Sequence, residues 1–191
     1  MHLMKKTLWT LLLVFGLSGC STVQVSDDYD TGTDFSQLKT YDWLPAGDQV
    51  KPTAEEFEKK NPLIAERIQK AVLANMNAKG YQFVSEKPNA YITYHVGVSS
   101  KIRSTPVTTS IGFGTGFYGG YGGLGVQTGS DIEEYQQGKV VLDILDSNKK
   151  LVWRGISTSD VDQHADPKEI TEQVNEIVQK LLAQYPPKKA K

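Results

Sequence analysis

The stretch GKVVLDILDSNKKLVWRGISTSD, residues 138–160, decides the fold of this chain, because it reads as two strands joined by a short turn. Successive side chains of a strand point to opposite faces, so the first half places three apolar side chains on one face: Val140, Leu142 and Ile144. Residues 147–149 supply the turn, and Asn148 tolerates a left-handed backbone there. The pattern predicts a β-hairpin with one face in the core.

The register of this hairpin depends on the length of its turn. A loop of two or four residues sets Ile144 opposite Trp153 on the core face and Asp143 opposite Arg154 on the other face, whereas a three-residue loop breaks this match. Opposite charges that face each other across strands stabilise a sheet by about 0.2–1 kcal/mol. Asp143 and Arg154 are therefore a candidate site for a small anion or a polar headgroup, and a plain cross-strand ion pair is the alternative.

The second face of the hairpin mixes this charged pair with four apolar side chains: Val141, Leu145, Val152 and Ile156. It is too apolar to be fully hydrated, so we expect a partner, the N-terminal segment or a loop of this chain to cover it. A further strand is predicted over residues 90–98, where the apolar side chains on one face should meet the helices. His95 lies on the other face of that strand, as a candidate binding residue or base or, alternatively, as a half-buried strand residue.

Two helices are indicated by apolar side chains at three- and four-residue spacing. The first follows Asn61, which we expect to cap it; Pro62 takes its first position and Gly80 ends it. The second begins after Asp166 with the spacing of a capping box, and its apolar stripe ends before the prolines at 186 and 187.

Shorter strands are predicted over residues 38–44, 81–84 and 107–111, and residues 46–60 read as a charged connection. The elements together predict an α+β fold: a two-layer sandwich with a mostly antiparallel sheet of about four to six strands and two helices on one face. We expect one domain over residues 34–187, followed by a basic tail at residues 188–191.

The N-terminal segment has the layout of a bacterial export signal. Residues 1–6 are basic, residues 7–17 are apolar, and Leu17-Ser18-Gly19-Cys20 follows; the apolar run is too short to span a bilayer stably. These four residues resemble a lipobox, which implies cleavage before Cys20, attachment of diacylglycerol to its sulfur and attachment of an acyl chain to its amine. We therefore expect residues 1–19 to be a signal peptide. A residue other than aspartate at position 21 resembles the signal that sorts lipoproteins to the periplasmic face of the outer membrane.

Residues 20–33 then read as the lipidated cysteine and a flexible tether, but residues 28–30 could instead form an edge strand of the domain. Cys20 is the chain's single cysteine. If a lipid consumes it, the domain folds without disulfides.

Composition changes over residues 112–125, where eight of fourteen residues are glycine. Such a stretch loses too much backbone entropy to pack as regular structure, so we expect a long loop. Its aromatic side chains are a candidate contact surface for lipid, peptidoglycan or an envelope protein, and the alternative is a connection that rests on the domain. The candidate residues are Phe113, Phe117, Tyr118 and Tyr121. The spelling GTGFYG at residues 114–119 does not indicate a dinucleotide site, because no helix follows it.

Several short stretches after Cys20 share a further pattern. They are Asp34-Phe35-Ser36, Thr40-Tyr41-Asp42-Trp43, Asn61-Pro62-Leu63, Gly80-Tyr81, Tyr94-His95-Val96, the glycine-aromatic loop, Leu151-Val152-Trp153-Arg154-Gly155 and Tyr185-Pro186-Pro187. As an ensemble they resemble a family of bacterial lipoproteins with a domain of unknown function, DUF4136. The resemblance implies export and one domain, and it implies no activity, ligand or catalytic residue.

The net charge and the absence of catalytic and metal-binding motifs reduce the number of function classes that fit the sequence. The net charge after residue 19 is about −3, which gives no basic field for nucleic acid. No nucleophile elbow or metal-ligand spacing is recognisable, so we predict no catalytic residue, no metal and no cofactor besides the lipid on Cys20.

We expect a non-catalytic, lipid-anchored binding or scaffolding protein of the cell envelope, with the membrane and an envelope protein or peptidoglycan as partners. Two alternatives stay open. A hydrolase or transferase of envelope polymers needs a cleft near His95, Asp143 or Arg154, and a carrier of small apolar ligands needs an apolar cavity between sheet and helices.

Overall fold

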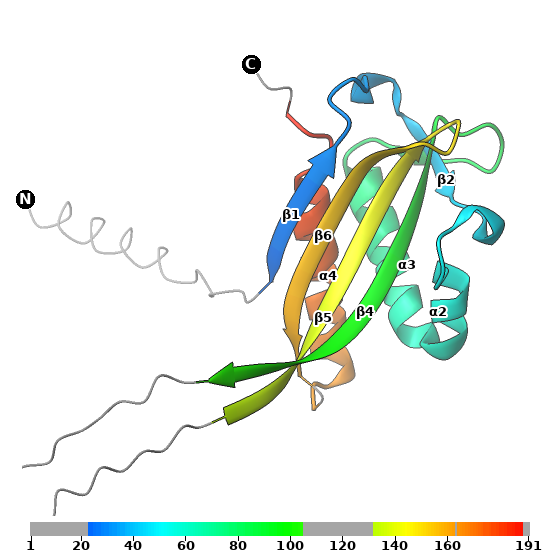
Figure 1. The fold of residues 1–191 in the computed structure, drawn as a ribbon. Coiled ribbons are helices and arrows are strands. Elements are labelled where there is room, and N and C mark those ends of the chain that lie inside the picture. Colours follow the sequence, from blue (N-terminus) through cyan, green and yellow to red (C-terminus); the bar gives the residue numbers. More distant parts are fainter. Residues whose placement is uncertain (1–22, 105–131, 163, 189–191) are drawn as a thin grey trace, which may run out of the picture.

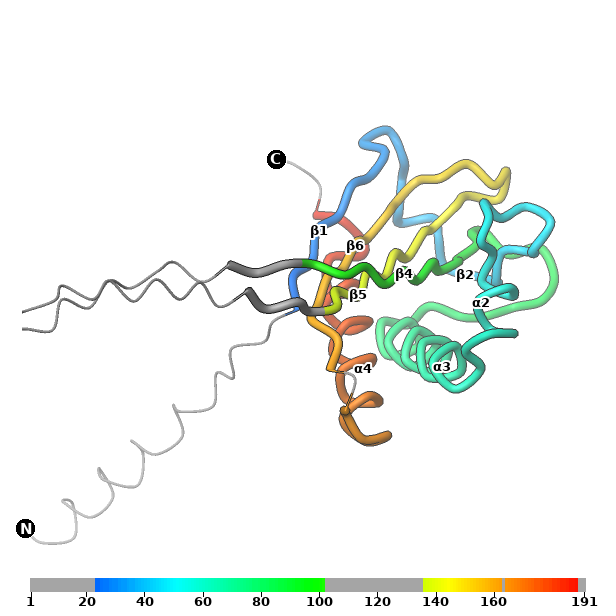
Figure 2. The backbone as a smooth tube through the Cα atoms, turned by 60° about the horizontal axis from the view of Figure 1, so that its bottom comes forward, coloured from blue at the N-terminus to red at the C-terminus, as the bar shows by residue number. Residues whose placement is uncertain are grey.

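The computed structural model describes residues 23–104, 132–162 and 164–188. In this part of the chain a six-stranded sheet packs on one face against the long helices α3 (Pro62–Ala78) and α4 (Pro167–Ala183) (Figure 1). Figure 2 shows both helices on the same side of the sheet. The predicted two-layer α+β sandwich is confirmed.

The sheet is mixed rather than purely antiparallel. Its strand order is β1 (Gln24–Tyr29), β6 (Leu151–Val161), β5 (Ile132–Asp146), β4 (Ala90–Ser104), β2 (Thr40–Trp43) and β3 (Gln82–Phe83). β1, β6, β5 and β4 pair antiparallel with their neighbours in this series. β2 pairs parallel with both β3 and β4. The strand predicted over residues 90–98 continues to Ser104.

The central hairpin has the predicted pairs but not the predicted turn. Ile144 lies opposite Trp153, and Asp143 lies opposite Arg154. Lys150 lies just before β6 as bounded above, but the Asp146 amide donates to its carbonyl, so the loop closed by this hydrogen bond has three residues, 147–149. The expectation that such a loop breaks the match was wrong, because a register shift between Ile144 and Leu145 restores it.

This bulge leaves Val152 as the extra residue between the partners of Ile144 and Leu145. Val152 is 2% exposed and belongs to the core, so its predicted place on the non-core face was wrong. The left-handed residue of the turn is Lys149, with φ of 64°, rather than Asn148.

The connection predicted over residues 46–60 contains a helix, α2 (Ala54–Lys60). A capping box starts it: the Glu56 amide donates to Thr53 Oγ1, and the Thr53 amide donates to the Glu56 carboxylate. Asn61 ends α2 and makes no side-chain cap for α3, contrary to the prediction. By contrast, Asp166 caps α4 in the capping box that its spacing predicted.

Part of the stretch read as a tether, residues 24–29, belongs to the sheet. β1 pairs along its whole length with β6, and Val23 before it is 8% exposed. The edge-strand alternative thus describes residues 24–29, although Asp30 lies just beyond the strand. Within the described residues the sheet starts at Gln24, four positions after Cys20 in the sequence.

Aromatic side chains fill one end of the core, where Tyr41 and Tyr185 are almost completely buried. The Tyr41 hydroxyl lies 3.0 Å from the Leu38 carbonyl and 2.7 Å from the Tyr185 hydroxyl. Because a carbonyl only accepts, Tyr41 donates to Leu38 and accepts from Tyr185. Trp153 packs on Tyr185 with ring centroids 5.2 Å apart, and this cluster fixes the C-terminal end of α4 against the sheet.

Candidate functional site

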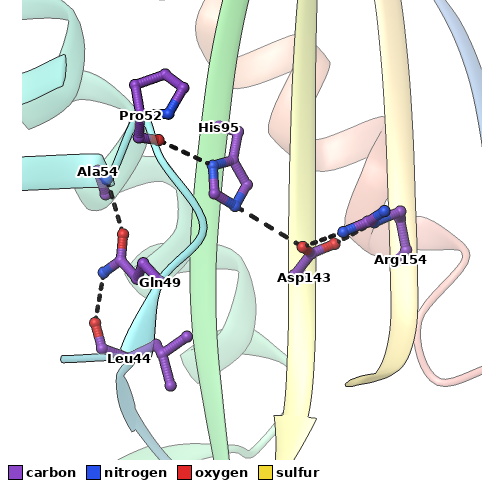
Figure 3. Close-up of polar contacts among 7 residues, drawn as sticks. All are labelled: Leu44, Gln49, Pro52, Ala54, His95, Asp143 and Arg154. Carbon is purple, nitrogen blue, oxygen red and sulfur yellow. Dashed lines mark hydrogen bonds and ion pairs between the residues drawn. The ribbon is translucent and has the colours of Figure 1, made fainter. Parts of the chain in front are cut away.

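The sheet face opposite the helices carries four polar side chains, Thr93, His95, Asp143 and Arg154, which we call the open-face cluster. The registers of β4, β5 and β6 set Thr93, Asp143 and Arg154 directly opposite one another. His95 is two residues along β4 from Thr93 and therefore projects from the same face. The structure thus brings together His95, Asp143 and Arg154, the three candidate residues that the sequence placed on this face (Figure 3).

Asp143 and Arg154 form a two-pronged ion pair. Arg154 Nε donates to Asp143 Oδ1 and Arg154 Nη2 donates to Oδ2, each over 2.7 Å. The Asp143 side chain is 6% exposed and that of Arg154 is 43% exposed, so a buried carboxylate lies beneath a guanidinium that reaches water. Hydrogen bonding to Asp143 raises the pKa of Arg154, and the smaller effect of burial lowers it. The predicted cross-strand pair is confirmed.

His95 connects the ion pair to a neighbouring loop. Its Nε2 lies 3.8 Å from Asp143 Oδ2, and its Nδ1 lies 3.3 Å from the carbonyl oxygen of Pro52 (Figure 3). Because a carbonyl only accepts, Nδ1 carries the proton in this hydrogen bond. The imidazole is 23% exposed, in agreement with a half-buried strand residue.

The loop that presents Pro52 is held by one side chain that sequence reasoning missed. Gln49 Nε2 donates to the Leu44 carbonyl over 2.5 Å, and Gln49 Oε1 accepts from the Ala54 amide over 2.7 Å (Figure 3). These two bonds join both ends of the segment between β2 and α2. No sequence signal relates this loop to His95, because 43 residues separate Pro52 from the histidine.

Thr93 is the second residue that the sequence reasoning did not single out. It is 3% exposed, and its hydroxyl has no hydrogen-bond partner among the described residues. Strand alternation places it on the same face as His95, but no chemical pattern marked it as a site residue. An unpaired buried hydroxyl costs about 1–3 kcal/mol, so Thr93 lowers the stability of the row that it forms with Asp143.

The chemistry available to this cluster is limited by its internal pairing. Both Asp143 oxygens accept from Arg154, so the carboxylate holds the guanidinium in place. A guanidinium has five N–H donors, of which the Asp143 pair uses two. The exposed part of Arg154 is therefore suited to contact an anion.

A second feature, which the sequence did not predict, is a groove of about 780 Å³ at one end of the domain. We call it the terminal groove; its residues follow β1, surround the 3₁₀ turn η1 (Phe35–Gln37) and include the last described prolines. Tyr29 and Phe35 meet edge to face at 6.1 Å, and Lys39 Nζ lies 5.8 Å from the Tyr81 ring centroid. Three stretches that carry the family resemblance converge here: residues 34–36, 80–81 and 185–187.

A third feature lies between the sheet and the helices at the other end of the domain. This helix–sheet cavity has a volume of about 240 Å³ and is lined mostly by apolar side chains from α2, α3, α4 and three strands. Its lining also includes the polar residues Asn61, Lys139, Ser159, Asp162 and Gln173. Examples are Ile64 and Ile68 from α3, Val96 and Val98 from β4, and Val174 and Ile177 from α4.

Several predicted features lie outside the described residues. They are Cys20, the strand predicted over residues 107–111, and the glycine-rich loop with its candidate residues Phe113, Phe117, Tyr118 and Tyr121. Within the described residues, no group of three histidine, cysteine or acidic side chains is arranged to hold a metal ion. None of the helices there has the length and apolar character needed to cross a membrane.

Comparisons with known structures concern the fold. A crystal structure of a PDZ domain protein from Parabacteroides distasonis matches with 14% identity and a TM-score of 0.52, over 89% of this chain and 36% of that one. The present chain thus spans about a third of the length of that protein. Two PelC dodecamer structures from Paraburkholderia phytofirmans match with 11% and 12% identity and TM-scores of 0.44 and 0.41. They cover 84% of this chain and 96% and 95% of theirs.

No curated protein sequence matches this chain significantly. A family model does match, over residues 25–187, and its description is "Domain of unknown function (DUF4136)". The matched range begins within β1, which agrees with a domain that starts before residue 34. The chain therefore belongs to the DUF4136 family.

Proposed function

We propose that this chain is a lipid-anchored protein on the periplasmic face of the outer membrane that binds or scaffolds another envelope component without catalysis. The observation that carries this proposal is the placement of the terminal groove at the end of β1 opposite to Val23, the first described residue, which follows Cys20 by three positions in the sequence.

The short link to Cys20 sets the distance of the domain from the lipid. Three residues span at most about 11 Å when fully extended, so Val23 stays close to a lipid leaflet that holds the acyl chains of Cys20. β1 then runs six residues from Gln24 to Tyr29, about 3.4 Å per residue, and carries the groove away from that leaflet. In Figure 1 the last described residues, in red, lie near the arrowhead of β1, the end of the strand away from Val23.

The groove offers chemistry for an extended ligand that is both polar and apolar. Its walls combine the partly buried rings of Tyr29 and Phe35 with the charged side chains of Asp34 and Lys39. Aromatic rings supply contact area while charges orient the partner. Peptidoglycan and an envelope protein both present such surfaces beyond the leaflet.

The open-face cluster supports binding over catalysis. Each oxygen of Asp143 already accepts a hydrogen bond from Arg154, so this carboxylate acts to hold the guanidinium in place. The exposed guanidinium edge is then a secondary contact for anionic groups.

The anchor is tested with Cys20→Ala. We expect metabolic labelling with an alkyne fatty acid to be lost and the protein to leave the outer-membrane fraction of a sucrose gradient. Unchanged labelling and unchanged fractionation of the variant contradict the proposal.

Binding through the groove is tested with Lys39→Glu in the anchored protein. The matched control is Lys168→Glu, at a highly exposed lysine on the first turn of α4. Sedimentation with purified peptidoglycan sacculi and in-cell crosslinking to envelope proteins report on the two kinds of partner. We expect Lys39→Glu alone to reduce one of these signals, and equal signals for both variants exclude the groove as the binding surface.

The second candidate function is a carrier of small apolar ligands. The helix–sheet cavity favours it, because an apolar cavity between sheet and helices is the feature that such a carrier requires. A carrier predicts that the purified protein retains a lipid that exchanges with added vesicles, which mass spectrometry of the organic extract detects.

A further inference from the structure

The helix–sheet cavity exists because small residues interrupt the core there. Nearer the hairpin turn, the core side of the sheet carries Trp153 and Ile144. At the cavity the same side of β5 and β6 carries Gly138 and Ser159 instead.

Size and lining suit a slender apolar guest. An engineered cavity of about 150 Å³ lined by aliphatic and aromatic side chains stays dry and binds benzene. The present cavity has about 240 Å³ and is open to solvent at its rim, where Ile64 and Ile170 are only partly buried. It accommodates part of a hydrocarbon chain. The aliphatic majority of its lining favours a segment without charge, although the lining also includes Lys139 and Asp162.

The described chain begins beside this cavity. The antiparallel register of β1 and β6 pairs Gln24 with Thr158, so one more step sets Val23 opposite Ser159, which lines the cavity. Neighbouring strands lie about 4.8 Å apart. Val23 also belongs to the same core cluster as Val174 and Ile177 of the cavity wall.

We propose that one acyl chain attached to Cys20 folds back from the lipid leaflet and occupies the helix–sheet cavity. This inference rests on the proposed lipidation of Cys20. The cysteine lies within about 11 Å of Val23 along the chain, so its acyl chains start next to the cavity. An ester- or amide-linked acyl chain is uncharged, and its covalent link gives it a high effective concentration at the cavity.

Docking of one acyl chain fixes the orientation of the domain relative to the membrane. The remaining chains stay in the leaflet, and the cavity end of the sandwich is held against the lipid surface by two attachments instead of one. The terminal groove then points away from the membrane.

The test places a photoreactive benzoylphenylalanine at Ile64 of the full-length protein in cells. Leu63 is the matched control, because it is adjacent on α3, is 65% exposed and does not line the cavity. After irradiation, digestion and mass spectrometry, we expect an adduct between position 64 and the acylated Cys20 peptide. This adduct should be absent from position 63 and from the Cys20→Ala background.

A second probe position guards against loss of folding. Val98 lines the cavity from the sheet and is 60% exposed, so a larger side chain is tolerated there, and Val50, 76% exposed and outside the cavity, is its control. We expect the same Cys20 adduct from Val98 and none from Val50.

The outcomes separate this inference from the proposed function. If Cys20 carries no label from fatty acid, the proposed function itself fails. If Cys20 is labelled but positions 64 and 98 give no adduct, or crosslink only to phospholipid, to another protein or to another segment of this chain, acyl docking is wrong while the anchor stands. A phospholipid adduct then supports the carrier function.

Discussion

Gly155 on β6 allows Trp153 to fold over the sheet, and adding one methyl group there tests the packing of the core. A Cβ at Gly155 would lie 2.4 Å from Trp153 Cη2, 3.0 Å from Cζ2 and 3.1 Å from Leu181 Cδ2. Trp153 is fully buried and Leu181 is 1% exposed, so neither side chain can move into solvent. Overpacking of a filled core costs about 1–3 kcal/mol, and we expect Gly155→Ala to lower the free energy of unfolding by that amount.

Gly97 on β4 provides the control, because a Cβ there meets no atom within 4 Å. Glycine inside a strand is destabilising by about 0.5–1 kcal/mol relative to alanine, so Gly97→Ala should stabilise the domain by that amount. For a chain of this length 1 kcal/mol corresponds to roughly 2–4 °C in Tm.

The assay is thermal and urea unfolding of the detergent-solubilised protein, followed by circular dichroism and tryptophan fluorescence. The two alanine substitutions should change Tm in opposite directions, downward for Gly155→Ala and upward for Gly97→Ala. If both variants change Tm by the same amount, or if Gly155→Ala is stabilising, Trp153 does not lie over Gly155 as described.

Four further outcomes follow from the described contacts. Tyr41→Phe should cost more than Tyr185→Phe in urea unfolding, because it leaves both the Leu38 carbonyl and the Tyr185 hydroxyl without their partner; equal losses contradict the assigned donors. Burial raises the pKa of Tyr41 above 10, so stability should be fully present below about pH 10 and decline by up to about 1.4 kcal/mol per pH unit above it, a decline that Tyr41→Phe should reduce. Thr53→Ala should lower the free energy of unfolding by about 0.5–2 kcal/mol through loss of the α2 capping box, and no change would mean that α2 contributes nothing to the cooperative fold. In a double-mutant cycle with Asp143→Asn and Arg154→Met we expect a coupling of about 0.5–3 kcal/mol, with values near the lower end because Arg154 is 43% exposed; additive effects contradict the ion pair.

The local pattern of the sequence determined the elements whose causes are local. Alternation in residues 138–160 assigned Ile144 to the core face and Asp143 to the opposite face, and the structure keeps both. Asp166 and Glu169 are three residues apart, which is enough to specify the capping box of α4. The same signal was present at Thr53 and Glu56 and was missed, although it would have revealed α2.

The bulge at Val152 marks the first limit of such reasoning. Turn length and register were treated as one choice, whereas the chain absorbs an extra residue inside β6. The buried pairing of Ile144 with Trp153 outweighs the local geometry of the turn, and nothing within the hairpin sequence reports that balance.

The candidate sites depended on contacts between distant segments, which only the tertiary structure decides. Strand alternation put His95 and Asp143 on non-core faces, but their approach required the β4–β5 register, and the contact of His95 with Pro52 required the path of the loop after β2. The terminal groove and the helix–sheet cavity arise where chain ends and helix ends leave space between layers. Space of this kind depends on how whole elements pack, and no single stretch of sequence encodes it.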